Sequence, residues 1–549
     1  MLKKKVLLAA VNSQYIHSNP AVFALEKVAQ ALPFYQIMRG DWSINMPKEQ
    51  VLREICQKQP QIIGLSVYIW NDDYIKSLAS DLRKVLPNCL IVVGGPQAAA
   101  AAEDWLSSDL CQVVVRGEGE DTWFNLLKEL AADRRYEVGA LWADADKFQP
   151  APQVDLADVP LSYSVDDLLE LKNKIIYYES SRGCPYGCSF CASGEDEIRF
   201  KPLDKVYQEL AFLAEHRQGQ IKFVDRTFNA DPQRAAQLCE FLLGLYRPGL
   251  SWHFEISPFL LTEQLLTLWR KAPVGYFQLE MGVQSLNQQV LKAINRHGSW
   301  QRARPKIEHI LAADNCHLHL DLIAGLPYET FSSFERAFNE LHKLYSHHLQ
   351  LGFLKVLPGS RLAAEASDFD LVYSSKPPYQ ILSTPTMTAG ELFLLQEAAD
   401  MVDLFYNSGR FRQTLFHAVN EWPSGALDFY IRLAALKKQR FIGSLGMAQR
   451  VELLSELLLT GDKRDLYFDL LRLDWRLYGH GQALLPQLRG SDDKKGVSVG
   501  SFNHEFVFLS SGLVDYRPVK SKLQFTYDRK IGVNQRAETK KILATEVNL

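Results

Sequence analysis

The 549-residue sequence predicts an α/β protein with three folded parts. These are an N-terminal doubly wound parallel sheet, a central partial barrel of six βα units, and a mostly helical C-terminal domain with some β-structure at its end. Short apolar runs alternate with amphipathic helical stretches along residues 5–115 and again along 175–356, a pattern typical of parallel sheets. A chain of this length also exceeds one ordinary core. We place the domains at 1–135, 173–372 and 373–549, with a linker over 136–172.

The composition is that of a globular protein, with 47% hydrophobic and 23% charged residues. The net charge of -3 gives no general attraction to nucleic acid or to an anionic membrane. The basic, apolar start predicts a buried first strand rather than a signal peptide, because the run ends at Asn12 without a small-residue cleavage site. No apolar segment reaches the length of a membrane span, so we expect no membrane insertion.

The N-terminal sheet is predicted from apolar runs at residues 5–11, 62–69, 90–93 and 113–115, with a helix over 73–86. Parallel sheets bind ligands beyond the carboxyl ends of their strands, and Ser66, Gly94, Gly95 and Gly117 fall there. Paired glycines let the backbone approach a large flat ligand closely. The Gly-x-Gly-x-x-Gly pattern of a dinucleotide site is missing from these turns. Simple turn glycines in a sheet without a ligand are the alternative.

A linker is predicted over residues 136–172, where periodicity weakens and prolines and aspartates accumulate. Such a segment is expected to lie across the surface.

Three cysteines, Cys184, Cys188 and Cys191, lie on a loop that Gly183 and Gly187 keep out of helix and strand. Three converging thiolates suit an iron–sulfur cluster, and with four irons they leave one iron without a protein ligand. A structural zinc site would need a fourth ligand, and no Cys-x-x-Cys partner follows. Unligated loop cysteines are a second alternative.

The other five cysteines are scattered in apolar settings: Cys56, Cys89, Cys111, Cys239 and Cys316. They are more typical of reduced core residues than of a disulfide framework. We therefore expect a reducing, cytoplasmic location.

Six βα units predict the central barrel, with active residues at the carboxyl ends of its strands. The predicted strands cover 175–180, 221–224, 252–256, 276–281, 317–323 and 351–356. The predicted helices include 205–215, 232–246, 262–270 and 334–344.

The Cys-x3-Cys-x2-Cys spacing is similar to the signature of the radical S-adenosylmethionine (radical SAM) enzymes. The resemblance implies a 4Fe-4S cluster on the three cysteines, which binds S-adenosylmethionine and cleaves it to a deoxyadenosyl radical. It extends to Gly325-Leu326-Pro327 after the fifth strand, which resembles the coproporphyrinogen oxidase-like and methylthiotransferase-like branches.

The same resemblance assigns residues to the cosubstrate. Asp225 would hold its amino-acid part, although a helix N-cap is the alternative for an aspartate there. Glu280 would contact the ribose, since a carboxylate accepts two hydroxyl hydrogen bonds. The remaining residues assigned to the cofactor in this way are Phe190, Glu255, Gln284 and Asp321.

The N-terminal sheet resembles the cobalamin-binding domain that precedes many radical SAM domains. Ser66, Gly94, Gly95 and Gly117 would then contact cobalamin. The Asp-x-His-x-x-Gly motif of many such domains is absent. His17 lacks the carboxylate that normally orients a metal-bound imidazole, so a hydrogen-bonded loop histidine is the alternative to a cobalt ligand.

The C-terminal part predicts helices over 391–407, 451–459 and 467–477 and strands near 505–509, 512–514 and 522–527. The tail over 517–541 is rich in lysine and arginine. These charges are interpreted as solvated surface charge or, alternatively, as a nucleic-acid contact. This part resembles the uncharacterised C-terminal regions of one cobalamin-dependent radical branch.

The expected function is radical methylation of an unidentified substrate, which the sequence leaves open as a small molecule, a peptide or an RNA. The expected electron donor is a low-potential protein such as flavodoxin or ferredoxin. A cobalamin-assisted radical oxidation or rearrangement and a non-catalytic cobalamin or redox sensor are the alternatives. Sulfur insertion is disfavoured because no second cysteine set exists.

Overall fold

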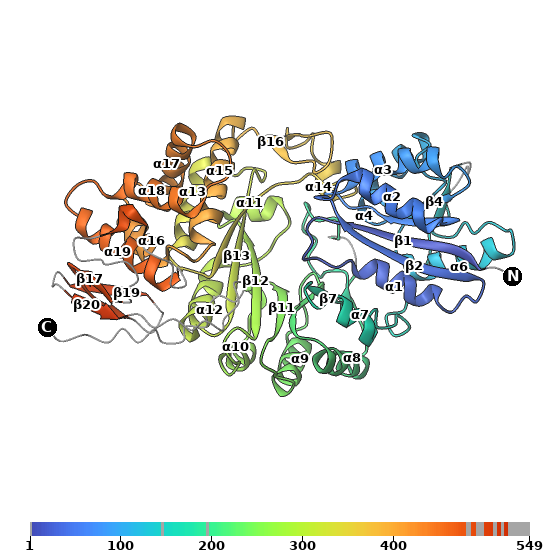
Figure 1. The fold of residues 1–549 in the computed structure, drawn as a ribbon, viewed down its shortest axis with the longest axis horizontal. Coiled ribbons are helices and arrows are strands. Elements are labelled where there is room, and N and C mark those ends of the chain that lie inside the picture. The colour runs from blue at the N-terminus through green and yellow to red at the C-terminus, as the bar shows by residue number, and fades with distance from the viewer. Residues whose placement is uncertain are drawn as a thin grey trace. The chain divides into compact units, whose positions relative to one another are not determined.

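The computed structural model describes residues 3–143, 148–193, 197–478, 485–489, 499–508, 513–517 and 521–524. They divide into two compact units (Figure 1). The first comprises residues 1–256, 294–296 and 355–381, and the second comprises 257–293, 297–354 and 382–549.

The N-terminal sheet has the strand order β2-β1-β3-β4-β5-β6. Its strands are β1 Lys4–Asn12, β2 Tyr35–Ser43, β3 Ile62–Ser66, β4 Leu90–Gly94, β5 Val113–Val115 and β6 Ala140–Trp142. The first five run parallel, which confirms the predicted doubly wound sheet, while β6 runs antiparallel to β5. The sequence did not reveal β2, whose residues mix polar and apolar types.

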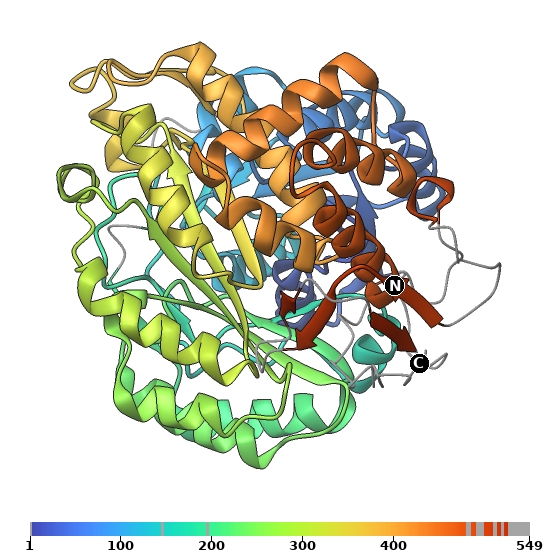
Figure 2. The same cartoon turned by 90° about the vertical axis from the view of Figure 1, so that its left-hand side faces the viewer.

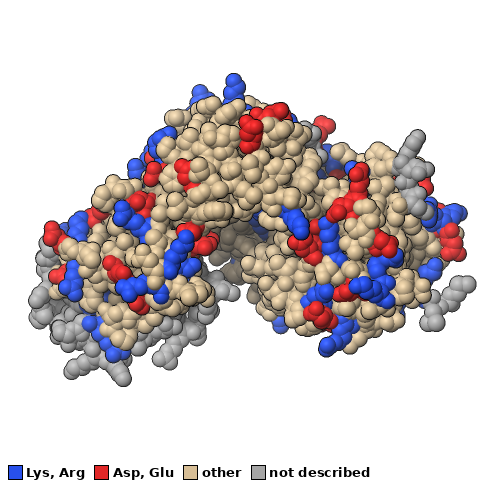
Figure 3. Space-filling model, turned by 90° about the horizontal axis from the view of Figure 1, so that it is seen from above, with Lys and Arg blue, Asp and Glu red and all other residues tan. Residues whose placement is uncertain are grey.

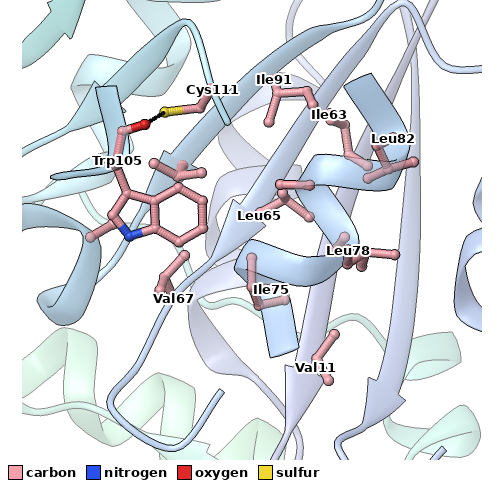
Figure 4. Close-up of a cluster of buried hydrophobic side chains, with 14 of the residues drawn as sticks. Val11, Ile63, Leu65, Val67, Ile75, Leu78, Leu82, Ile91, Trp105 and Cys111 are labelled. Atoms are coloured by element: carbon pink, nitrogen blue, oxygen red, sulfur yellow. Dashed lines mark hydrogen bonds between the residues drawn. The ribbon is translucent and has the colours of Figure 1, made fainter. Parts of the chain in front are cut away.

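Helices cover both faces of this sheet, as the order of its strands requires. Two apolar clusters fill the layers between sheet and helices. In the first, Leu78 and Ile75 of α3 lie against Ile63 and Leu65 of β3 (Figure 4). The helices are α1 Pro20–Ala29, α2 Lys48–Lys58, α3 Asp72–Val85, α4 Pro96–Ala100, α5 Ala102–Ser107 and α6 Gly119–Ala131.

The stretch predicted as a linker carries regular structure. It contains β6 and the short helix α7, Val165–Glu170, and Val154, Leu156 and Val159 form a small buried cluster. Strand β6 therefore extends the N-terminal sheet, so the described part of this stretch does more than cross the surface.

A second six-stranded sheet has the order β14-β13-β12-β11-β10-β7, as expected for the central partial barrel. Its strands are β7 Ile176–Tyr178, β10 Gly219–Phe223, β11 Leu250–Ile256, β12 Phe277–Gln284, β13 His317–Ala324 and β14 His348–Phe353. The registers described between them are parallel.

Helices follow the strands of this sheet and lie outside its yellow strands in Figure 2. They are α8 Leu203–His216, α9 Pro232–Gly244, η1 Pro258–Leu260, α10 Glu263–Arg270, α11 Gln288–Ala293, α12 Trp300–Ala313, α13 Phe331–His342 and α14 Arg361–Ala364. The predicted βα alternation is confirmed.

The C-terminal part is mostly helical, as predicted. It contains β15 Val372–Tyr373, β16 Ile381–Ser383, α15 Ala389–Met401, η2 Val402–Tyr406, α16 Arg412–Asn420, α17 Gly425–Arg440, α18 Met447–Leu458, α19 Arg464–Tyr478 and η3 Pro486–Leu488. Four short strands follow: β17 Val499–Phe502, β18 Glu505–Phe508, β19 Val514–Arg517 and β20 Ser521–Gln524. They form two antiparallel pairs, β18 with β19 and β17 with β20. Most of the predicted basic tail, residues 525–541, lies outside the described residues.

Acidic and basic side chains are interspersed over the face seen in Figure 3, in line with the small net charge. Among the described residues, no helix has the length and the apolar character that crossing a lipid bilayer requires.

Leu78 tests the packing of α3, because its side chain is fully buried in the first cluster. Leu78→Ala is expected to reduce the free energy of unfolding by about 3 kcal/mol through lost burial and the cavity left behind. Val85→Ala, on the same helix but half exposed, is expected to cost less than about 0.5 kcal/mol. Denaturant unfolding of both variants makes the comparison, and equal losses would contradict this packing.

Candidate active site

The cysteine loop begins where β7 ends, at the carboxyl end of a barrel strand. Its two ends pair as a short antiparallel ladder of β8, Ser181–Arg182, with β9, Arg199–Phe200. Gly183 has a φ of 85°, a left-handed conformation that glycine adopts without strain. The chain therefore leaves β8 in a sharp turn that leads directly to Cys184.

Backbone hydrogen bonds fix the middle of this loop to two distant segments of the first unit. The Ser189 N–H donates to the Ile294 carbonyl over 3.0 Å, and the Leu362 N–H donates to the Ser189 carbonyl over 2.7 Å. The Asn295 side-chain amide donates to the Gly187 carbonyl over 2.8 Å. The loop is thus held in place although its glycines and proline favour no regular structure.

The three thiols share one electrostatic environment. Cys188 is buried, and Cys184 and Cys191 are half-buried. Burial raises the pKa of Cys188, the Arg296 guanidinium lowers it, and the charges of the other two cysteines raise it again. Arg296 donates to the Cys188 sulfur over 3.5 Å, and the Thr227 hydroxyl lies 3.4 Å from the Cys184 sulfur.

These surroundings fit a cluster better than a single zinc ion. Thiolates around a tetrahedral ion at about 2.3 Å would stand about 3.8 Å apart. Among the described residues, the group of three metal-ligating side chains whose donor atoms all lie within 4.8 Å is Glu280, His319 and Asp321, not the three cysteines. The buried Ser189 hydroxyl, between Cys188 and Cys191, has no hydrogen-bond partner among the described residues and could donate to a cluster sulfur.

Asp225 lies at the start of the loop, beside Ser180 and Ser181. One carboxylate oxygen accepts the Ser180 N–H over 2.8 Å and the Ser181 N–H over 3.2 Å, and the other accepts the Ser180 hydroxyl over 2.5 Å. Burial raises the pKa of this carboxyl to about 6. Both oxygens are therefore engaged with the start of the cysteine loop, while the helix cap is supplied by Asp231. The predicted contact of Asp225 with the cosubstrate stays a prediction.

Two other predicted residues belong to the first unit. Glu255 lies near the end of β11 and pairs with Lys222 of β10 over 3.1 Å. Phe190 is half-buried between the second and third cysteines. Their contacts with the cosubstrate also stay predictions.

Gln284, in the second unit, stands in a strained position at the end of β12. The register with β13 shifts between Gly282 and Gln284, and Gln284 has a φ of 70°. Its buried amide oxygen has no hydrogen-bond partner among the described residues. Strain and an unmet acceptor together are typical of a residue that receives a ligand.

The loop after β12 is held by hydrogen bonds to Glu329. Ser285 donates a hydrogen bond to the buried Glu329, whose backbone carbonyl accepts the Thr386 hydroxyl over 2.9 Å. Burial raises the pKa of the Glu329 carboxyl. Glu280 and Asp321 lie nearby on β12 and β13, on the same face of the sheet, together with His319.

The carboxyl edge of the N-terminal sheet holds the residues predicted to contact cobalamin. The Ser66 hydroxyl accepts a hydrogen bond from Asn19 over 3.0 Å. Gly95 has a φ of 106°, and a side chain there would lie 2.6 Å from the Val67 carbonyl. The backbone therefore requires a glycine at position 95 whether or not a ligand binds, as the alternative of a turn glycine expects. Gly117, with a φ of 87°, faces open space, and a side chain at Gly94 would make only ordinary contacts.

His17 is tied to the strand that leads into the barrel. Its Nδ1 lies 2.6 Å from the Tyr177 hydroxyl, and the Ile175 N–H donates to the Ile16 carbonyl over 2.7 Å. Burial and then Lys222 lower the pKa of the imidazole, so the ring is neutral at physiological pH. The orienting partner is a tyrosine hydroxyl rather than a carboxylate, which agrees with a hydrogen-bonded loop histidine.

Three sequence families match successive parts of the chain. The radical SAM superfamily matches residues 178–341, and the B12 binding domain matches residues 6–127. The chain is a radical SAM protein with a B12-binding domain. A protein family of unknown function, DUF4080, matches residues 367–506, so the C-terminal part is shared with other proteins of unassigned role.

Curated relatives of this radical SAM chain include methyltransferases and a cyclase. The cobalamin-dependent radical SAM methyltransferase TokK of Streptomyces tokunonensis is 25% identical over 55% of this chain and 48% of its own length. The anaerobic magnesium-protoporphyrin IX monomethyl ester cyclase of Cereibacter sphaeroides is 24% identical over 53% and 50%. The chain thus spans about half the length of these relatives.

Solved structures share the fold. The radical SAM methyltransferase TsrM from Kitasatospora setae superposes with a TM-score of 0.59 at 14% identity, covering 79% of this chain and 100% of that one. The cobalamin-dependent radical enzyme OxsB gives 0.60 at 15% identity, covering 86% and 79%. The cofactors of such a radical SAM chain with a B12-binding domain are a 4Fe-4S cluster, S-adenosylmethionine and cobalamin, as the sequence predicted.

Several residues around the cluster site escaped sequence reasoning. Arg296 and Asn295 follow α11 far from the cysteines, and Ser189 stands in a motif position that accepts many residues. Their roles depend on spatial neighbours, so no spacing rule along the chain indicates them.

The raised pKa of Asp225 predicts a pH dependence. Its pKa rises from 3.8 to about 6 on folding, so the native state binds this proton more tightly than the unfolded state. Stability from this group therefore falls as the pH rises from about 4 to about 6 and is constant above. Asp225→Asn keeps an acceptor for the two N–H groups. Because the amide does not titrate, the variant should not show this decrease in stability between about pH 4 and about pH 6.

Denaturant unfolding of wild type and Asp225→Asn at about pH 4.5 and about pH 7 measures this linkage. The variant is expected to gain about 2 kcal/mol relative to wild type between the two values. A difference that does not change with pH would contradict the assignment.

Arg296 predicts an effect on the cluster itself. Removing a positive charge beside Cys188 disfavours the reduced, more negative cluster, so Arg296→Met is expected to lower its midpoint potential by on the order of 50 mV. Arg296→Lys should retain most of the wild-type value. A redox titration followed by electron paramagnetic resonance (EPR) compares them with Arg302→Met, an exposed control. An unchanged potential in Arg296→Met would refute this role.

Proposed function

We propose that this protein is a cytoplasmic, cobalamin-dependent radical SAM methyltransferase acting on an unidentified substrate. When bound, the cluster and S-adenosylmethionine supply one-electron cleavage of a sulfonium bond, and cobalamin supplies a transferable methyl group. Cys184, Cys188 and Cys191 would hold the cluster. Its electron would come from a low-potential protein such as flavodoxin or ferredoxin.

The observation that carries the proposal is an ion-pair network between the cysteine loop and the carboxyl edge of the N-terminal sheet. Arg182 at the start of the loop pairs with Glu120 and lies 3.5 Å from Glu118, and Arg199 at its end pairs with Glu118. Glu118 directly follows Gly117, the glycine of that edge that faces open space, and Glu120 is two residues further on. The predicted cobalamin edge and the cluster loop therefore adjoin within one compact unit.

The chain's own residues would prepare the site for radical chemistry. The backbone hydrogen bonds of Gly187 and Ser189 fix the loop, and Asp225 fixes its first turn. In the second unit, Gln284, which the sequence predicts as a cosubstrate contact, has a strained backbone and a buried amide oxygen. Fixed positions of this kind favour a reaction that must exclude water and competing hydrogen donors.

Relatives that are named as cyclases keep a second candidate open, a cobalamin-assisted radical reaction without methyl transfer. The eight cysteines are free thiols in the structure, which supports a reducing location for either activity.

Anaerobic reconstitution tests the proposal. Protein with iron, sulfide and cobalamin, given a low-potential reductant and S-adenosylmethionine, is expected to form 5′-deoxyadenosine slowly and to transfer labelled methyl groups to its cobalamin. Deoxyadenosine without labelled cobalamin would favour the second candidate. If neither product forms, both candidates are refuted.

Single cysteine variants provide the matched comparison. Cys184→Ala, Cys188→Ala and Cys191→Ala are each expected to lose the cluster absorbance and to reduce deoxyadenosine formation at least about a hundredfold. Cys56→Ala, a half-buried cysteine outside the loop, should retain both. Full cluster absorbance in any of the three loop variants would overturn the ligand assignment.

A further inference from the structure

A pocket opens in the C-terminal part of the chain, within the second unit. Its volume is about 450 Å³, which is in the range of small-molecule sites. It lies between the turn after η2 and the start of α18, inside the stretch that matches the family of unknown function. The pocket is lined by Ser408, Arg410, Leu445, Gly446, Met447 and Arg450. None of these residues is assigned to the cluster, to S-adenosylmethionine or to cobalamin.

The guanidinium of Arg450 is held in place by two backbone groups. Its Nη1 donates to the Leu404 carbonyl over 3.1 Å, and its Nε donates to the Leu445 carbonyl over 3.2 Å. Its Nη2 makes no hydrogen bond among the described residues, so this group can donate to a ligand. Leu404 belongs to η2, a π-helical turn, and such turns are rare and frequent at functional sites.

Arg410 brings a second guanidinium to the same pocket. Gly409 makes the preceding turn with a φ of 68°, and the Ser408 hydroxyl accepts the Arg410 N–H over 3.3 Å. Among the described residues, neither Arg410 nor Arg450 forms an ion pair. Burial and then the charge of Arg410 lower the pKa of Arg450. Two neighbouring cations that no carboxylate compensates favour an anion between them.

The N-terminus of α18 borders the pocket as well. Its N-cap residue is Gly446, which has no side chain to cap the helix, and the Gly446 N–H donates to the Gln449 side chain over 2.8 Å. The first N–H groups of a helix lack partners within it, and the helix dipole favours negative charge there. The helix therefore adds to the positive potential that the two arginines establish.

We propose that this pocket binds a small molecule through a phosphate group. Guanidinium groups donate paired hydrogen bonds to phosphate oxygens, and two of them offset the charge of a phosphate monoester. A phosphate ion alone does not fill a pocket of this volume, and Leu445 and Met447 add apolar side chains to its wall. The ligand is therefore a phosphorylated organic molecule, and the C-terminal part of the chain supplies its binding site.

Calorimetric titration of the reconstituted full-length protein tests the site at low ionic strength, where screening is weakest. Inorganic phosphate is expected to bind to one saturable site per chain. Phenyl phosphate adds an apolar ring that can contact Leu445 and Met447, so it should bind at least about tenfold more tightly. If neither probe shows a saturable site, the proposal is overturned, and equal affinities would overturn the assignment to an organic phosphate. The titration measures binding only, so its result is independent of the proposed methyl transfer.

Variants locate the bound phosphate. Arg410→Gln and Arg450→Gln are each expected to weaken phenyl phosphate binding at least about tenfold, because each loses a charge-assisted hydrogen bond. Arg464→Gln removes an exposed arginine at the start of α19 that has no ion pair among the described residues, and it should bind as wild type does.

Circular dichroism verifies that the variants fold. Arg410 is exposed, so Arg410→Gln keeps the test valid even where Arg450→Gln disturbs the contacts with Leu404 and Leu445. Wild-type affinity in folded Arg410→Gln, or an equal loss in all three variants, would overturn the site.

Discussion

The ion pairs of Arg182 and Arg199 with Glu118 and Glu120 are the constraint on which the cofactor arrangement depends. All four side chains are largely withdrawn from solvent. Although burial lowers the pKa of Arg182, the charges of Glu179 and Glu120 raise it above its ordinary value, so the arginine stays charged. A partly buried pair that loses one partner leaves an uncompensated charge, which strongly destabilises the contact. These ion pairs therefore fix the cysteine loop to the edge of the N-terminal sheet.

The same loop is fixed a second time from the barrel side. Asp225 binds its first turn, and segments near Ile294 and Leu362 bind its middle. A loop rich in glycine and proline has little intrinsic preference for one conformation. External hydrogen bonds must supply that preference, so the position of the thiols results from residues far from the cysteines in sequence.

This explains what could be predicted from the sequence. The alternation of apolar runs predicted most strands of both sheets. Strands that helices cover are buried, so their residues must be apolar, and the sequence shows them as apolar runs. Strands β2 and β6 were missed: β2 is only partly buried, and β6 lies in the stretch predicted as a linker. At the site, the prediction of the cluster ligands came from three cysteines at the Cys-x3-Cys-x2-Cys spacing. The predicted ligand contacts of Gly95 and Asp225 stay predictions. The close approach of Gly95 to Val67 and the hydrogen bonds of Asp225 to Ser180 join residues far apart in the chain, so no linear pattern reveals them.

The C-terminal part solves a problem that an open barrel creates. Edge strand β14 would leave backbone groups unpaired on its outer side. The Asn407 side chain pairs there as a strand would: its amide oxygen accepts the Leu349 N–H over 2.9 Å, and its amide nitrogen donates to the Leu349 carbonyl over 3.0 Å.

A buried histidine joins the C-terminal helices to the barrel. The fully buried His342 of α13 lies 3.0 Å from the Tyr430 hydroxyl of α17, and burial lowers the pKa of His342 to about 3. An uncharged imidazole in an apolar layer is typical of permanent packing, so these helices belong to the barrel's core. The part of the chain with no assigned role therefore closes the open edge of the barrel sheet at β14.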